Sequence, residues 1–120
     1  MSIINKPNSR IMQLYQKEAI NNARKYSELI NKYIDAEKIV LFGSYAKGNS
    51  NKDSDIDIAV IVDTVSDDFL SISTMLNKLT RDIDYRIEPV LLDSKDDKSG
   101  FLTTILLYGM TLYDKKNKNF

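Results

Sequence analysis

Two aspartates open one of the apolar runs of this chain, and their spacing places both carboxylates on one side of a strand. Asp55 and Asp57 flank Ile56, and the apolar run continues to Val62. Residues two apart in a strand point to the same face, about 7 Å apart along it. Like charges held this close are unfavourable unless a cation lies between them. Mg²⁺ prefers oxygen ligands and is often shared between carboxylates and substrate phosphates, so the pair indicates a magnesium site.

Gly43 and Ser44 end the preceding apolar run and supply a complementary feature. A glycine lets the backbone approach a ligand closely, and residues 44–47 can form a short helical turn whose first N–H groups favour an anion. A site with phosphate-binding donors on one side and metal-binding carboxylates on the other is suited to phosphoryl or nucleotidyl transfer. The alternative is a polar hairpin loop closed by Asp side chains, which explains neither Gly43 nor the paired carboxylates.

The composition excludes several kinds of site. The 120 residues include no Cys and no His, which removes disulfides, Cys/His zinc sites, cysteine nucleophiles and His-based triads. Lys+Arg and Asp+Glu both number 17, so the chain lacks the overall basic charge of a nucleic-acid binder. The longest apolar run is too short to cross a bilayer, and the first residues lack the apolar core of a signal peptide. We expect a cytoplasmic protein with no membrane or nucleic-acid partner.

Hydrophobic periodicity predicts the elements that position these residues. Apolar residues three and four apart predict an amphipathic helix over 9–34. Residues 1–8 are expected to be a flexible lead-in, and residues 114–120 a polar tail. The other predicted elements are strands at 38–42, 55–62, 83–92 and 110–113, a short turn helix after the first strand, and helices at about 69–79 and 101–108. This order and length predict a single α+β (α/β-like) domain with a small mixed sheet backed by helices.

The two motifs together resemble the signature of a known family. Residues 43–48 read Gly-Ser-Tyr-Ala-Lys-Gly, and residues 54–58 read Ser-Asp-Ile-Asp-Ile. The combination, with its spacing, is similar to the signature of the minimal nucleotidyltransferases of the DNA polymerase β superfamily. Either motif alone would mean little, whereas both at the ends of apolar runs are specific. The resemblance covers about residues 35–113 and implies the nucleotidyltransferase palm, within a domain of residues 9–113.

Members of this family use a third carboxylate on the strand beside the Asp-x-Asp strand. Alternation along residues 83–92 places Asp84, Arg86 and Glu88 on one face. Pro89 cannot donate to a ladder, so this strand is expected at a sheet edge or near its end. Glu88 is the preferred third carboxylate. Asp84 is the alternative, because the family often has Asp in this role. A structural interpretation is that Arg86 and Glu88 pair with neighbours on an exposed sheet face.

The resemblance implies Mg²⁺-dependent transfer of a nucleoside monophosphate, AMP from ATP in the working hypothesis, to a hydroxyl. The implied catalytic and metal-binding residues are Asp55, Asp57 and Glu88, and the implied nucleotide-binding residues are Gly43, Ser44 and Lys47. Lys47 would neutralise departing pyrophosphate, although a solvated surface lysine is an equally good interpretation of it.

The short proteins of this family resemble the antitoxin partners of small all-helical HEPN toxins, in which AMP is placed on a toxin tyrosine. The resemblance therefore implies a HEPN-like helical partner and a homo- or hetero-oligomer. An alternative of another class is a non-catalytic nucleotide- or partner-binding module that neutralises its partner by contact alone. A third carboxylate within metal reach of Asp55 and Asp57 would favour the enzyme.

Overall fold

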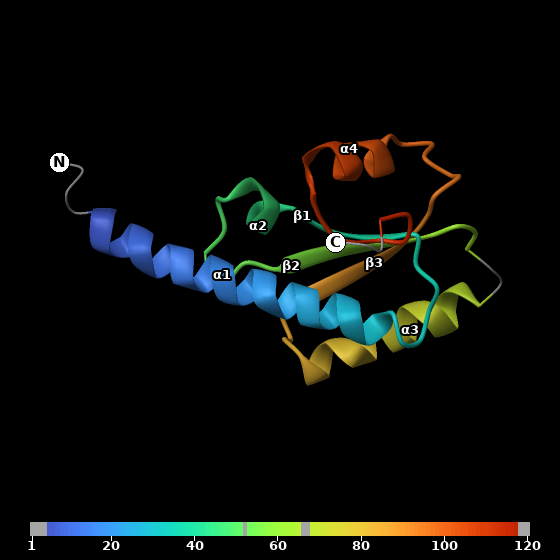
Figure 1. Cartoon of the computed structure of the whole chain (residues 1–120), viewed down its shortest axis with the longest axis horizontal. Helices are drawn as coiled ribbons and strands as arrows, with labels where there is room; N and C mark the ends of the chain where they lie inside the picture. The colour runs from blue at the N-terminus through green and yellow to red at the C-terminus, as the bar shows by residue number, and fades with distance from the viewer. Residues whose placement is uncertain (1–4, 52, 66–67, 118–120) are drawn as a thin grey trace.

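A four-stranded mixed sheet forms the centre of the molecule, with helices on both of its faces (Figure 1). The computed structural model describes residues 5–51, 53–65 and 68–117. The elements follow the chain as α1 (Asn5–Ile30), β1 (Lys38–Phe42), α2 (Ser44–Lys47), β2 (Ile56–Val62), α3 (Phe69–Leu79), the 3₁₀ turn η2 (Thr80–Asp82), β3 (Ile87–Asp93), α4 (Phe101–Tyr108) and β4 (Met110–Asp114). The predicted α+β architecture, with a small mixed sheet backed by helices, is confirmed.

The strand register brings the two sequence motifs to one edge of the sheet. The strands lie in the order β3-β2-β1-β4, and β1 pairs antiparallel with both β2 and β4. Phe42 at the end of β1 is opposite Asp57, and Glu88 in the parallel strand β3 is also opposite Asp57. β3 is an edge strand, as Pro89 predicted. The end of β1 and the starts of β2 and β3 therefore meet.

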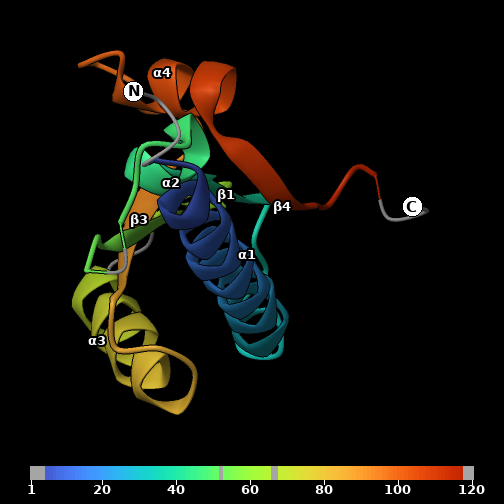
Figure 2. The same ribbon diagram turned by 90° about the vertical axis from the view of Figure 1, so that its left-hand side faces the viewer.

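The two faces of the sheet carry separate apolar clusters. α1 and α3 cover one face and α4 covers the other (Figures 1 and 2). Ile56, Ile58 and Val60 of β2 pack in the cluster on the α1–α3 face, whereas Ala59 and Ile61 pack in the cluster with α4. Side chains alternate along a strand, so Asp57, which lies between Ile56 and Ile58, is on the α4 face.

α1 is displaced from the predicted helix by four residues at each end. It begins at Asn5, because a proline such as Pro7 is tolerated in the first turn of a helix, where its missing N–H has no partner to lose. Residues 1–4 of the predicted lead-in lie outside the described residues. The helix ends at Ile30, and Tyr33 and Ile34 donate backbone hydrogen bonds to Ile30 in the turn that follows. In Figure 1 the first half of α1 extends beyond the sheet.

The buried stripe of α1 agrees with the predicted periodicity. Ala19, Ala23, Tyr26 and Ile30 are fully buried and face the sheet and α3. The Tyr26 hydroxyl donates to the Leu76 carbonyl of α3 at 2.7 Å, and burial raises the pKa of this tyrosine. This hydrogen bond satisfies the only polar atom of a side chain that is otherwise core. Tyr26 is therefore a structural residue that joins α1 to α3.

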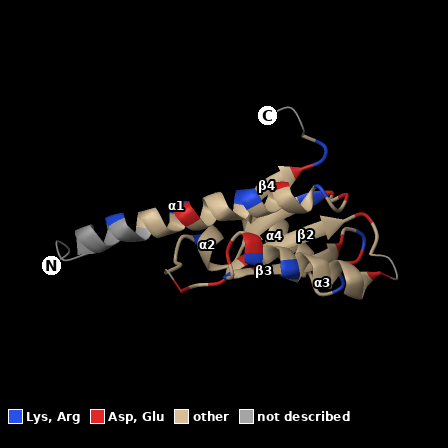
Figure 3. Cartoon of the chain, turned by 90° about the horizontal axis from the view of Figure 1, so that it is seen from below, with Lys and Arg blue, Asp and Glu red and all other residues tan. Residues whose placement is uncertain are grey.

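The last strand, the surface charge and the helix lengths complete the description of the fold. β4 ends at Asp114, the first residue of the predicted polar tail, and residues 118–120 of that tail lie outside the described part. In the cartoon of Figure 3, the segments coloured for Lys and Arg are intermixed with those coloured for Asp and Glu. Among the helices that the structure describes, none is long and apolar enough to span a membrane.

Candidate active site

Gly43 joins β1 to α2 and lies directly against Asp57. Its backbone has φ 75° and ψ −149°, a conformation that is essentially restricted to glycine. A Cβ atom at this position would overlap Oδ2 of Asp57. The backbone therefore favours glycine here, and any larger residue would also require the Asp57 carboxylate to move. The contact shows that the first motif and the Asp-x-Asp motif lie side by side.

α2 is a single helical turn that starts at this contact. The Lys47 N–H donates to the Gly43 carbonyl at 3.1 Å, and Gly48, with φ 77°, ends the turn in the left-handed region. The N-cap, Gly43, has no side chain to accept hydrogen bonds from the first N–H groups of the turn. Ser44 is half-buried at the start of α2, beside these N–H groups. The predicted phosphate-binding residues therefore stand beside Asp57.

The three predicted carboxylates differ in exposure. Asp57 is half-buried, whereas Asp55 and Glu88 are exposed. Burial raises the pKa of Asp57, and the negative charges of Asp55 and Glu88 raise it further. In the part of the chain that the structure describes, none of the three forms an ion pair with Lys or Arg. The site therefore carries a negative charge that a bound cation would offset.

The donor chemistry of this group fits a hard divalent cation. Within residues 5–51, 53–65 and 68–117, no three acidic side chains lie close enough together to hold a metal as they stand. Mg²⁺ usually takes one or two carboxylates and completes its shell with water and substrate phosphates. Asp55 and Asp57 can supply those carboxylates. The negative charge of Glu88 raises the pKa of Asp57. The Glu88 side chain is exposed, and it is not part of any ion pair among the residues that the structure describes.

Asp84, the alternative third carboxylate, is part of a different cluster. Its Oδ2 accepts hydrogen bonds from Arg86 Nη2 at 2.7 Å and from Asn22 Nδ2 of α1 at 3.0 Å, and its side chain is only 7% exposed. Burial opposes ionisation, but the hydrogen bonds from Arg86 and Asn22 outweigh it and lower the pKa of Asp84. Asp84 is thus a paired carboxylate that contacts α1.

The predicted strand over 83–92 was wrong in its first residues, and this explains the misplacement of Asp84. α3 continues into η2, and the Asp84 N–H donates to the Thr80 carbonyl at 2.8 Å. β3 begins only at Ile87. The alternation that grouped Asp84 and Arg86 with Glu88 therefore does not apply. Glu88 remains the candidate for the third carboxylate.

Arg86 also anchors the loop between α2 and β2, a role that sequence reasoning missed. Its Nη1 donates to the Tyr45 hydroxyl at 3.2 Å, and that hydroxyl donates to the Asn51 carbonyl at 2.9 Å. Tyr45 is buried in the core on the α1–α3 face. The cluster of Asn22, Asp84, Arg86 and Tyr45 thus links α1, the start of β3 and the loop that leads to Asp55. The aromatic side chain of Tyr45 in an otherwise polar loop was the available signal.

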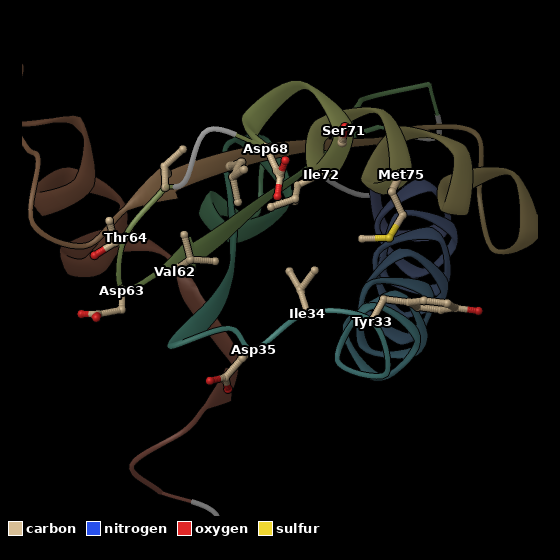
Figure 4. Close-up of a pocket in the computed structure, with 12 residues that line it drawn as sticks. Tyr33, Ile34, Asp35, Val62, Asp63, Thr64, Asp68, Ser71, Ile72 and Met75 are labelled. Atoms are coloured by element: carbon tan, nitrogen blue, oxygen red, sulfur yellow. The ribbon is translucent and has the colours of Figure 1, made fainter.

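Two pockets lie at opposite ends of the sheet. One, of about 450 Å³, lies between α2 and α4 and is bounded partly by Gly43 and Lys47, which places Lys47 at the candidate site. The other, of about 590 Å³, is formed by the turn after α1, the end of β2 and α3 (Figure 4). Val62 of the second pocket is five residues from Asp57 along β2, about 17 Å at the usual rise per residue. Of these two pockets, the first shares Gly43 with the contact to Asp57.

Comparisons with known proteins agree with this geometry. The family model described as "Polymerase beta, Nucleotidyltransferase" matches residues 24–118. The chain is 36% identical over 78 residues to MJ0604 of Methanocaldococcus jannaschii, provisionally named a protein adenylyltransferase; the match covers 64% of this chain and 78% of that protein.

Two solved structures share the fold. One is a protein of Sulfolobus solfataricus, provisionally described as a nucleotidyltransferase, with a TM-score of 0.66 and 18% identity over 88% of this chain and 89% of that one. The other is a toxin–antitoxin structure with AMP-PNP, with a TM-score of 0.61 and 28% identity over 79% of this chain and 75% of that one. The first likeness concerns the fold alone.

Proposed function

The chain belongs to the polymerase β nucleotidyltransferase family, and we propose that it transfers AMP from ATP to a hydroxyl group of a partner protein. The observation that carries the proposal is the contact between Gly43 and Asp57, since it brings the turn that we expect to bind phosphate next to a carboxylate whose pKa is raised by burial and by two neighbouring carboxylates. The similarity to a protein named as a protein adenylyltransferase supports the choice of a protein acceptor.

Asp55 and Asp57 would hold Mg²⁺ at the start of β2. Bound Mg²⁺ would neutralise phosphate charge and lower the pKa of the attacking hydroxyl. Gly43 allows the triphosphate to approach the backbone, and the Ser44 hydroxyl and the first N–H groups of α2 would bind its β and γ phosphates. Lys47 lies near enough to this turn to offset the negative charge of departing pyrophosphate.

The reaction itself is a displacement at the α phosphorus. The bond from the acceptor oxygen to this phosphorus forms while the bond to the bridging oxygen of pyrophosphate breaks. The hydroxyl proton would pass to the Glu88 carboxylate, which stands opposite Asp57 in the neighbouring strand and is open to solvent. In a chain with no histidine, a carboxylate is a suitable base for this role.

The proposed acceptor is a tyrosine of a small helical, HEPN-type toxin, so the chain would act as an antitoxin in a hetero-oligomer. The similarity to a chain of a toxin–antitoxin structure with AMP-PNP supports both the nucleotide and the kind of partner. The proposal places the protein in the cytoplasm, where ATP is available.

A second candidate is a binding module that neutralises its partner by contact, without transfer. One observation favours it: among the described residues, no three carboxylates are gathered into a ready metal site. The two candidates differ in whether a covalent product forms.

The test is a labelling assay with ATP labelled at the α phosphate, Mg²⁺ and lysate of the source cell. The wild type should label one protein band, and the Asp55→Asn/Asp57→Asn variant should label none. Asp63→Asn is the matched control, because Asp63 is an exposed acid beyond the other end of β2 that pairs with Lys95. ATP binding without any labelled product would contradict protein adenylylation and favour the binding module.

A further inference from the structure

The pocket between α2 and α4 directly continues the candidate active site. We call it the α2–α4 pocket; its lining includes Phe42, Gly43, Ala46, Lys47, Phe101 and Tyr108. Its volume of about 450 Å³ is within the range of small-molecule sites. Gly43 belongs both to this pocket and to the contact with Asp57. A ligand with phosphates at α2 could therefore extend into the pocket without leaving the α4 face.

Aromatic side chains form much of the lining. The rings of Phe42 and Phe101 meet edge to face, with centroids 5.7 Å apart and planes at 85°. Phe101 is 42% exposed and Tyr108 is 70% exposed, although both line the pocket. Exposed aromatic rings beside a phosphate-binding turn offer stacking surfaces, and an aromatic side chain stacks on any nucleobase.

The side of the pocket formed by α4 is held in place by close packing. α4 ends at Tyr108, and a Cβ atom at the following residue, Gly109, would overlap the Val40 side chain and the backbone oxygens of Leu41 and Ile105. The end of α4 therefore lies against β1, and Leu102 and Ile105 of α4 are buried in the apolar cluster on this face. The α4 side of the pocket is consequently packed against β1.

We propose that the α2–α4 pocket receives the base of the donor nucleotide, adenine in the reaction proposed above, with the base against Phe101 and Tyr108. This inference rests on the proposed function. Because the triphosphate is assigned to Gly43 and Ser44, the base must occupy a neighbouring site. The pocket is the apolar site that shares Gly43 with the turn. The acceptor then approaches from the exposed side chains of Asp55 and Glu88.

Two adjacent residues of α4 give a matched pair of variants. Tyr108 and Leu107 are exposed to the same extent, 70% and 69%, but only Tyr108 lines the pocket. Calorimetry would measure the affinities of wild type, Tyr108→Ala and Leu107→Ala for ATP and for inorganic tripolyphosphate, each with Mg²⁺. Tyr108→Ala should weaken ATP binding about tenfold, as expected for one lost stacking contact. It should leave tripolyphosphate binding unchanged, and Leu107→Ala should change neither affinity.

A second variant approaches the pocket from α2. Ala46→Leu adds side-chain volume to the lining and should weaken ATP binding more than tripolyphosphate binding. Circular dichroism would verify that each variant is folded. Equal ATP affinities in Tyr108→Ala and Leu107→Ala, or equal wild-type affinities for ATP and tripolyphosphate, would overturn the base pocket and leave the proposed transfer intact. A wild type that binds neither compound would overturn both.

Discussion

Asp57 and Asp84 lie near the same end of the sheet but have opposite electrostatic surroundings. Asp84 faces α1, and its carboxylate accepts hydrogen bonds from Arg86 and Asn22, which together lower its pKa despite burial. Asp57 faces α4, where burial and two further carboxylates raise its pKa. The first is a carboxylate with its countercharge built into the fold. The second forms no ion pair with Lys or Arg among the residues that the structure describes, so a bound cation would supply its countercharge.

Within this one domain, Asp84 has a structural role, whereas Asp57 is a candidate functional residue. The cluster of Asn22, Asp84, Arg86 and Tyr45 holds the loop that leads to the Asp-x-Asp motif, so the paired carboxylate contributes to the position of the unpaired one. Sites that bind or react commonly give up stability for activity. We therefore expect substitutions on the two faces to have opposite effects on folding and on transfer.

The largest expected effect is that of Asp57→Asn on transfer. The substitution keeps the shape of the side chain and removes a charge that we propose binds metal, so the rate should fall at least about a thousandfold, or about 4 kcal/mol of transition-state stabilisation. The free energy of unfolding without metal should stay the same or rise, because a repelled charge is removed. Initial rates of α-label transfer and urea unfolding would measure the two. Full activity would refute the metal-binding role.

Asp84→Ala should act on folding instead of on transfer and destabilise the fold by about 3–5 kcal/mol, because it removes the carboxylate from a half-buried ion pair with Arg86. Urea unfolding measures this change. The double variant Asp84→Ala/Arg86→Met should recover part of the loss, since it also removes the positive charge with which Asp84 pairs. A cost no larger than that of a surface substitution would show that the cluster does not stabilise the fold.

Gly43→Ala tests the contact between the two motifs. Its backbone conformation alone should cost about 1–3 kcal/mol in an alanine. Gly48→Ala is the matched control: Gly48 also has positive φ, but its Cβ would meet no heavy atom within 4 Å. Gly43→Ala should weaken binding of Mg²⁺ with ATP, measured by calorimetry, whereas Gly48→Ala should not. Equal ATP affinities in the two variants would mean that ATP binding does not depend on the position of the Asp57 carboxylate.

The smallest expected effect is on pH dependence. The folded-state pKa of Asp84 is lowered, so its contribution to stability is present above its unfolded pKa of about 3.9 and is lost as pH falls through the folded value. Asp84→Asn should therefore be destabilised near pH 7, and the difference from wild type should shrink at acid pH. Unfolding midpoints between pH 7 and pH 3 would measure it. A difference independent of pH would assign the stabilisation to packing.

The sequence was most informative where chemistry depends on local spacing. Alternation placed Asp57 on one face of β2, and the position of Gly43 at the end of an apolar run predicted a close backbone approach. Both depend on neighbours along the chain. The fold class followed from the order of the elements, because short segments with clear periodicity leave few arrangements.

The sequence was less informative where distant segments meet. The hydrogen bond from Asn22 to Asp84 joins residues 62 positions apart, and the one from Arg86 to Tyr45 joins residues 41 apart. Nothing in a local pattern indicates such pairing. The error in the predicted start of β3 has the same origin. The residues before Ile87 form a turn that is held by hydrogen bonds to the end of α3 and by the Arg86 N–H. The α2–α4 pocket also depends on tertiary packing, because α4 is apolar nearly all round and its sequence does not show which residues face α2.

The most direct test is the thermal stability of wild type and Asp57→Asn with and without Mg²⁺ and ATP. A ligand that binds only the folded state at 100 times its Kd adds about 2.7 kcal/mol, which raises the Tm of a domain of this size by several degrees. The account predicts that rise in the wild type, and it predicts almost none in Asp57→Asn, whose ligand-free Tm should equal or exceed that of the wild type. An equal rise in both proteins, or a lower ligand-free Tm in the variant, would contradict the conclusion that Asp57 is a carboxylate held in place for a cation.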